Sequence, residues 1–348
     1  MRRLLFMTVG VLSIIVPQAL LVAGQTAATQ GASAASSRSA WKPARTADGH
    51  PDLQGMWDFR TVTPLERPAE FANKPFLTDE EAAAYERRIV EARDADANRE
   101  QSKTDTSRGV VNGQVITADV ALAYNDFWWD RGTKVVGNRQ TSLIVDPPDG
   151  KIPALTAEGK RRLEAQDAER ERLALGPEDR SVGERCISGF NSGPPMVPGG
   201  YNMNVQVIQA PGYVVLVNEM VHSARIVPLD NRPLGKVTAR TGSSRGRWEG
   251  DTLVVETKNF TDETSLRGSS PNLHLIERFT RVDQDTLLYQ FTVSDPTTWT
   301  RPWTAQIAMR LTTDQMFEYA CHEANYGMTN LLKGARFLEK EAAAKPSR

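Results

Sequence analysis

The chain has 348 residues, of which 40% are hydrophobic and 24% charged, and its 42 basic residues nearly balance its 43 acidic ones. Such a composition is ordinary for a globular protein with a substantial core. The near-neutral charge excludes an electrostatic reason to expect nucleic acid or an anionic membrane as a partner.

The N-terminus has the pattern of a secretory signal. Two arginines directly follow Met1, and the next twenty residues, to Ala23, are mostly apolar. We expect a signal peptide over 1–24 and a disordered leader over 25–40, where bulky apolar residues are scarce. An uncleaved membrane anchor is the alternative, and Pro17 argues against it. A periplasmic or secreted protein without stable membrane insertion is therefore predicted.

Residues 41–185 are predicted to form an N-terminal segment with two helices that pack on a barrel. A first strand begins near Trp57. Thr78 and Glu81 have the spacing of a capping box, which predicts a helix from this point through Glu100. A second helix is predicted from Thr156 to Ala174, before a Gly-Pro stop.

Residues 186–334 carry short β-branched and aromatic runs separated by tight turns, which is typical of antiparallel strands. The sequence predicts a mainly β fold, an antiparallel meander that closes into a lipocalin-like barrel or a bent sheet, with a sandwich as the alternative. Residues 335–348 are assigned to a C-terminal tail. The predicted strands are 205–209, 213–219, 224–229, 245–248, 253–260, 274–282, 286–293, 304–311 and 316–321.

The chain contains two cysteines, Cys186 and Cys321. In an oxidising compartment a single disulfide between them is expected, and two separate buried thiols are the alternative. This bond would place the Gly- and Pro-rich loop over 189–200 beside His322.

Some sequence strings resemble known families. Gly55-Met56-Trp57 is similar to the Gly-x-Trp that opens the first strand of lipocalins, which implies a barrel. The longer strings PDLQGMW, WEGDTLVVET and DPTTWTRPWT resemble a family of uncharacterised exported bacterial proteins. That resemblance implies an extracytoplasmic location and supplies no catalytic residue.

Motif searches assign no cofactor and no metal ligand. The G-x-S-x-G match over 242–246 is followed by a strand, whereas a nucleophile elbow needs a helix there. Three histidines nevertheless fall near predicted strand ends, each with a glutamate close in sequence. If those ends converge, one imidazole would act as a general base with a carboxylate partner, or three would bind a metal. The candidate set is His222, His274, His322, Glu219, Glu277 and Glu323, and three unrelated histidines are the alternative.

Two aromatic clusters are candidate substrate-binding sites, because indole faces beside polar groups suit a sugar or an aromatic ring. Arginine in either cluster would hold an acidic group. Packing of the N-terminal segment on the barrel is the alternative for both. The candidate residues are Tyr124, Asp126, Trp128, Trp129 and Arg131 in the first cluster, Trp299, Arg301 and Trp303 in the second, and Tyr326.

Together these patterns predict an exported enzyme that uses acid-base chemistry, as a lyase, hydrolase or isomerase, on a small organic molecule of aromatic or sugar-like character. A noncatalytic, lipocalin-like ligand-binding protein of the cell envelope is the alternative. A third possibility, an envelope structural protein, needs no pocket at all.

Overall fold

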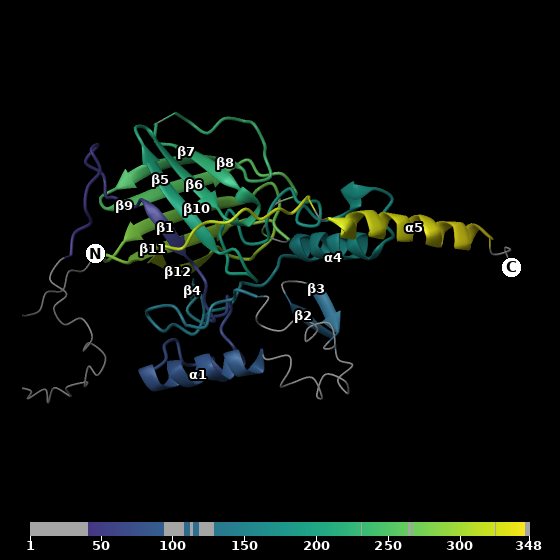
Figure 1. Ribbon diagram of the computed structural model, residues 1–348, viewed down its shortest axis with the longest axis horizontal. Coiled ribbons are helices and arrows are strands. Elements are labelled where there is room, and N and C mark those ends of the chain that lie inside the picture. Colours follow the sequence, from purple (N-terminus) through teal and green to yellow (C-terminus); the bar gives the residue numbers. More distant parts are fainter. Residues whose placement is uncertain are drawn as a thin grey trace, which may run out of the picture. The chain divides into compact units, whose positions relative to one another are not determined.

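A computed structural model (Figure 1) describes residues 41–93, 108–111, 114–117, 129–230, 232–263, 266, 268–323 and 325–344. The expected signal peptide and leader lie outside these residues. Within them, no helix combines the length and the apolar character that crossing a membrane requires.

The fold is mainly β, as predicted, and its centre is a ten-stranded antiparallel sheet in the order β7-β6-β5-β1-β12-β11-β10-β9-β8, with β4 also paired to β12. A separate hairpin joins β2 (Arg108–Val111) to β3 (Gln114–Thr117). The strands of the main sheet are β1 (Gly55–Asp58), β4 (Ile144–Asp146), β5 (Asn204–Ala210), β6 (Tyr213–Asn218), β7 (Ala224–Pro228), β8 (Ser243–Glu249), β9 (Thr252–Lys258), β10 (His274–Arg281), β11 (Thr286–Ser294) and β12 (Trp303–Thr312).

The sheet is bent and does not close into a barrel, so the bent-sheet alternative is correct and the closed barrel is wrong. The two end strands, β7 and β8, are not joined by a ladder. They approach each other through side chains instead. A Cβ on Gly246 would lie only 2.9 Å from Cγ1 of Val227, and the Arg245 Nε lies 3.5 Å from an oxygen of Asp230. Side chains therefore fill the seam where main-chain hydrogen bonds would close a barrel.

Strict alternation of buried and half-buried residues along β11 directs one face of the sheet to the core. That concave side is filled by large side chains, each at most 1% exposed: Trp57, Phe279, Tyr289, Phe291 and Trp303. Burial of each such side chain contributes about 1.5–3 kcal/mol. The interior of the sheet is thus packed as a core.

Strand β1 lies in the middle of the sheet, between β5 and β12. Trp57 is paired with Val205 on one side and with Leu311 on the other. Gly55 has a φ of +140°, and a Cβ there would lie 2.8 Å from Cδ1 of Leu311. Glycine is therefore required for β1 to approach β12 so closely.

Three α-helices accompany the sheet among the described residues. Helix α1 (Asp79–Ala92) begins with the predicted capping box, in which the Glu81 amide donates to the Thr78 hydroxyl and the Thr78 amide donates to the Glu81 carboxylate. Helix α4 (Ala157–Glu171) is capped by Thr156. Helix α5 (Tyr326–Ala344) occupies most of the region assigned to a tail. Short 3-10 turns lie at η1 (Ala69–Phe71), η3 (Pro177–Asp179) and η4 (Met220–His222).

An extended segment over 313–323, here called the strap, connects β12 to α5 and crosses the sheet as the yellow trace in Figure 1. The expected strand over 316–321 is wrong, because the strap joins no ladder. It is held instead by an ion pair from Asp314 to Arg60, a hydrogen bond from the Phe317 amide to a Glu219 oxygen, and the disulfide. That disulfide, between Cys186 and Cys321, is confirmed.

A buried charged cluster ties the two sides of the bent sheet together. Arg225 on β7 donates two hydrogen bonds, of 2.5 and 2.9 Å, to the carboxylate of Glu277 on β10. The Tyr289 hydroxyl donates to the same carboxylate and accepts from the Met196 amide. Burial together with Glu277 raises the pKa of Tyr289 well above its ordinary value. Tyr289 and Arg225 therefore stay protonated near neutral pH.

We expect Glu277→Gln to destabilise the fold by about 3–5 kcal/mol, because it leaves the Arg225 guanidinium buried without a compensating charge. The neighbouring Arg278→Gln is the control, since its ion pair with Glu249 is 39% exposed on each side and such pairs contribute at most about 1 kcal/mol. Urea unfolding measures both changes. Equal losses in the two variants would show that the buried pair has no special role.

Candidate functional site

His274 has a carboxylate partner on the neighbouring strand. Its Nε2 lies 3.0 Å from an oxygen of Glu256 on β9, and the same carboxylate pairs with Lys258. Partial burial and the Lys258 charge lower the pKa of His274, against the opposing effect of Glu256. Glu277 lies on the other face of β10, where it binds Arg225. His274 is thus neutral near pH 7.

His222 lies in a strained turn beside a buried carboxylate. Val221 and His222 have φ angles of +57° and +36°, and a β-branched residue seldom adopts this left-handed conformation. The adjacent Glu219 is only 5% exposed. Its oxygens accept from the side-chain amide of Asn204 at 3.0 Å and from the Phe317 amide at 3.2 Å. The His222 side chain itself is exposed.

His322 and Glu323 are exposed at the end of the strap. In the part of the chain that the structure describes, no hydrogen bond or ion pair joins two of the three candidate histidines. Nor does that part contain a group of three or more His, Cys, Asp or Glu side chains placed to hold a metal. The histidine contacts therefore do not support the expected shared site, which stays a prediction.

The second aromatic cluster is divided between core and surface. Trp299 and Trp303 are 5% and 0% exposed, with their rings perpendicular and 6.0 Å apart, so they pack in the core as the alternative proposed. Arg301 forms a half-exposed ion pair with Asp146. Tyr326 begins α5 and is 72% exposed. These four residues do not form one site.

Two residues of the first cluster border the Gly- and Pro-rich loop, while Tyr124, Asp126 and Trp128 lie outside the described residues. The Arg131 guanidinium lies 4.0 Å from the centre of the Trp129 ring. A Cβ on Gly200 would lie 2.7 Å from the same ring, and one on Gly199 would lie 2.6 Å from the Phe190 ring. The two glycines therefore allow aromatic rings to pack directly on the loop backbone.

A pocket of about 220 Å³, here called the Arg131 pocket, opens at this place. Its walls come from the segment after β1, from the end of α1, and from the Gly- and Pro-rich loop. They combine two guanidinium groups with mostly apolar side chains. The lining residues are Thr61, Val62, Thr63, Pro64, Leu65, Arg93, Arg131, Leu143, Val197, Pro198 and Gly199.

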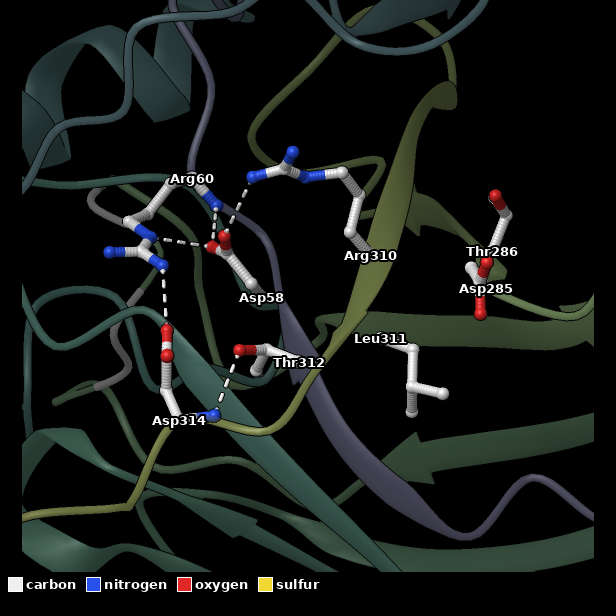
Figure 2. A pocket seen from close by; sticks show the side chains of 8 residues that line it. All are labelled: Asp58, Arg60, Asp285, Thr286, Arg310, Leu311, Thr312 and Asp314. Atoms are coloured by element: carbon white, nitrogen blue, oxygen red, sulfur yellow. Dashed lines mark hydrogen bonds and ion pairs between the residues drawn. The ribbon is translucent and has the colours of Figure 1, made fainter.

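A larger pocket of about 350 Å³, here called the Asp58 pocket, was not predicted and is shown in Figure 2. Asp58 is 3% exposed and accepts from the Arg60 Nε at 2.8 Å and from Arg310 at 3.4 Å. Arg60 also reaches Asp130 and Asp314. The other lining residues are Asp285, Thr286, Leu311 and Thr312.

The hydrogen bond from Arg60 to Asp58 raises the pKa of that guanidinium, and Asp130 raises it further. This network fastens the end of β1 to both the strap and residue 130. In the sequence, the only local indication of this network is Asp58 at the end of a strand, with Arg60 two residues later. Arg310 is 252 residues away from Asp58, so spacing gave no indication of it.

Comparisons with protein families, curated proteins and solved structures find no match to this chain.

We expect the NMR titration midpoint of His274 to lie below about 6.5, the ordinary value for histidine. Lys258→Met should move the midpoint upward, because it removes a neighbouring positive charge that disfavours the protonated ring. Lys340→Met, on α5, is the control. A midpoint above the ordinary value, or one unaffected by loss of Lys258, would contradict the described contacts.

Proposed function

We propose that this chain is an exported binding protein for a small organic acid with a flat apolar body, which is held in the Arg131 pocket. The observation that carries the proposal is the composition of the pocket wall, in which two arginines line the same pocket as apolar residues such as Leu65 and Leu143. Small-molecule sites commonly combine an apolar lining with a few polar groups that fix the orientation of the ligand.

Several contacts give the pocket a fixed shape. The Thr61 hydroxyl donates to the Lys134 carbonyl, and the Thr63 hydroxyl accepts from the Val136 amide. Arg131 lies against the Trp129 ring, which holds its planar group in one orientation. A guanidinium positioned in this way suits a carboxylate, which it can bind through two parallel hydrogen bonds.

The same wall favours binding over acid-base catalysis at this pocket. Its lining residues, all among those that the structure describes, include no histidine, cysteine, lysine or carboxylate. Arginine remains protonated in proteins and is a poor proton donor or acceptor. The pocket can orient an acid, but its own side chains provide no group to move a proton.

Export is supported by two features. The first 24 residues have the pattern of a signal peptide, and the Cys186–Cys321 disulfide is of the kind that persists in oxidising compartments. We infer a periplasmic or secreted location from this combination.

A second candidate function, acid-base catalysis at Glu219 and His222, is favoured by the strained turn, because such strain is often found at functional sites. Under this proposal Glu219→Gln would abolish turnover of a substrate while leaving its binding intact. Val221→Gly, which relieves the left-handed strain, would raise stability and lower activity. An activity that survives both changes would remove this candidate.

For the binding function, we expect 1-naphthoate to bind more tightly than 1-naphthamide, its neutral analogue. Arg131→Gln should weaken naphthoate binding by about ten- to a hundredfold, the range for a hydrogen bond to a charged group, with little effect on the amide. Titration calorimetry measures both. Arg301→Gln, at an exposed arginine outside the pocket, is the matched control. Equal affinity for acid and amide, or equal losses in the two variants, would refute the proposal.

A further inference from the structure

The Asp58 pocket is built on a row of polar residues that crosses the outer face of the sheet. Asp58 on β1 is paired with Asn204 on β5 and with Arg310 on β12, and Arg310 is paired in turn with Thr286 on β11. Their neighbours Trp57 and Met309 point into the core, so alternation directs the row outward. Strand register therefore fixes Arg310 beside Thr286.

Arg310 keeps most of its hydrogen-bonding capacity. Its side chain is 70% exposed, and its one ion pair among the described residues is the 3.4 Å contact to Asp58. Charge-assisted hydrogen bonds between such groups are normally about 2.7–2.9 Å long. Asp58 already accepts two shorter hydrogen bonds from Arg60, both of 2.8 Å. The Arg310 guanidinium, which points toward Asp58 in Figure 2, therefore keeps N–H groups for an anionic group in the pocket.

Asp285 lines the same pocket with an available negative charge. Its backbone is fixed, because the amide donates to Asp283 and the carbonyl accepts from the Leu311 amide. Its carboxylate makes no hydrogen bond or ion pair with any residue that the structure describes. Although Arg310 and Asp285 line one pocket, they do not pair with each other. Asp314, 60% exposed and 3.4 Å from Arg60, adds a second acid.

We propose that the Asp58 pocket binds a zwitterion, namely a free amino acid or a short peptide with unblocked ends. The ligand carboxylate would bind Arg310 and the Thr286 hydroxyl, and its ammonium group would bind Asp285. The pocket volume, about 350 Å³, lies in the range of small-molecule sites, roughly 300–1,000 Å³.

The mixture of charges selects this ligand class over simpler ions. A simple anion at Arg310 would be repelled by Asp285 and Asp314, and a simple cation would be repelled by Arg60 and Arg310. A zwitterion can place its carboxylate beside an arginine and its ammonium group beside an aspartate. Repulsion between like charges then disfavours the wrong ligands, which is a recognised source of specificity. This site shares no lining residue with the Arg131 pocket.

The experiment uses tri-L-alanine as the probe and titration calorimetry on the full folded chain. Two analogues test each end separately, one with an acetylated amine and one with an amidated carboxyl group. We expect tri-L-alanine to bind. The affinity of each analogue should be at least about tenfold lower, because each loses a hydrogen bond to a charged group.

Two variants test which pocket residue binds each end of the peptide. Arg310→Gln should abolish the preference for the free carboxylate but keep the preference for the free amine, and Asp285→Asn should do the reverse. Arg247→Gln and Asp251→Asn, at exposed ion-paired residues outside the pocket, should change neither preference. Arg131→Gln should also leave tri-L-alanine binding unchanged, which separates this test from that of the proposed function. Absence of saturable binding, equal affinity for blocked and free peptides, or loss of both preferences in either variant would overturn the proposal.

Discussion

Four residues, Gly55–Asp58, hold the sheet together, because among the strands that the structure describes β1 alone links β5 to β12. On one side of it lie β5, β6 and β7, and on the other the meander from β8 to β12. Without β1 these would be two separate sheets, each with an additional unpaired edge, and exposed edges promote aggregation. The fit depends on Gly55, whose missing side chain leaves room for Leu311, and on Trp57, which fills the core beneath.

The chain that leaves β1 also separates the two pockets. Asp58 and Arg60 line one of them, and the next five residues, Thr61 to Leu65, line the other. Arg60 is the common support, since it binds Asp58 on its own strand, Asp314 on the strap and Asp130 next to Arg131. This guanidinium therefore connects the lining of one pocket to the segment that carries Arg131 in the other.

Local patterns in the sequence predicted the features that depend on neighbouring residues. Runs of β-branched and aromatic residues between turns located β9 to β12, the Thr78 capping box located α1, and the cysteine pair predicted the disulfide. The features that were missed depend on distant partners. The strap has the composition of a strand but finds no strand to pair with. Arg225 and Glu277 lie on strands whose proximity follows only from the bend of the sheet, and Arg310 meets Asp58 only because β1 inserts beside β12.

The position of β1 also affects the order in which the protein can fold. Its hydrogen-bonded neighbours are made much later in synthesis: Leu53 bonds to Gln209, 156 residues on, and Asp58 meets Arg310, 252 residues on. Contacts of such long range form slowly, because a large loop must close first. β1 therefore cannot take its place between β5 and β12 until nearly the whole chain has been synthesised. For a protein exported as proposed here, this topology keeps the sheet incomplete until β12 has been made.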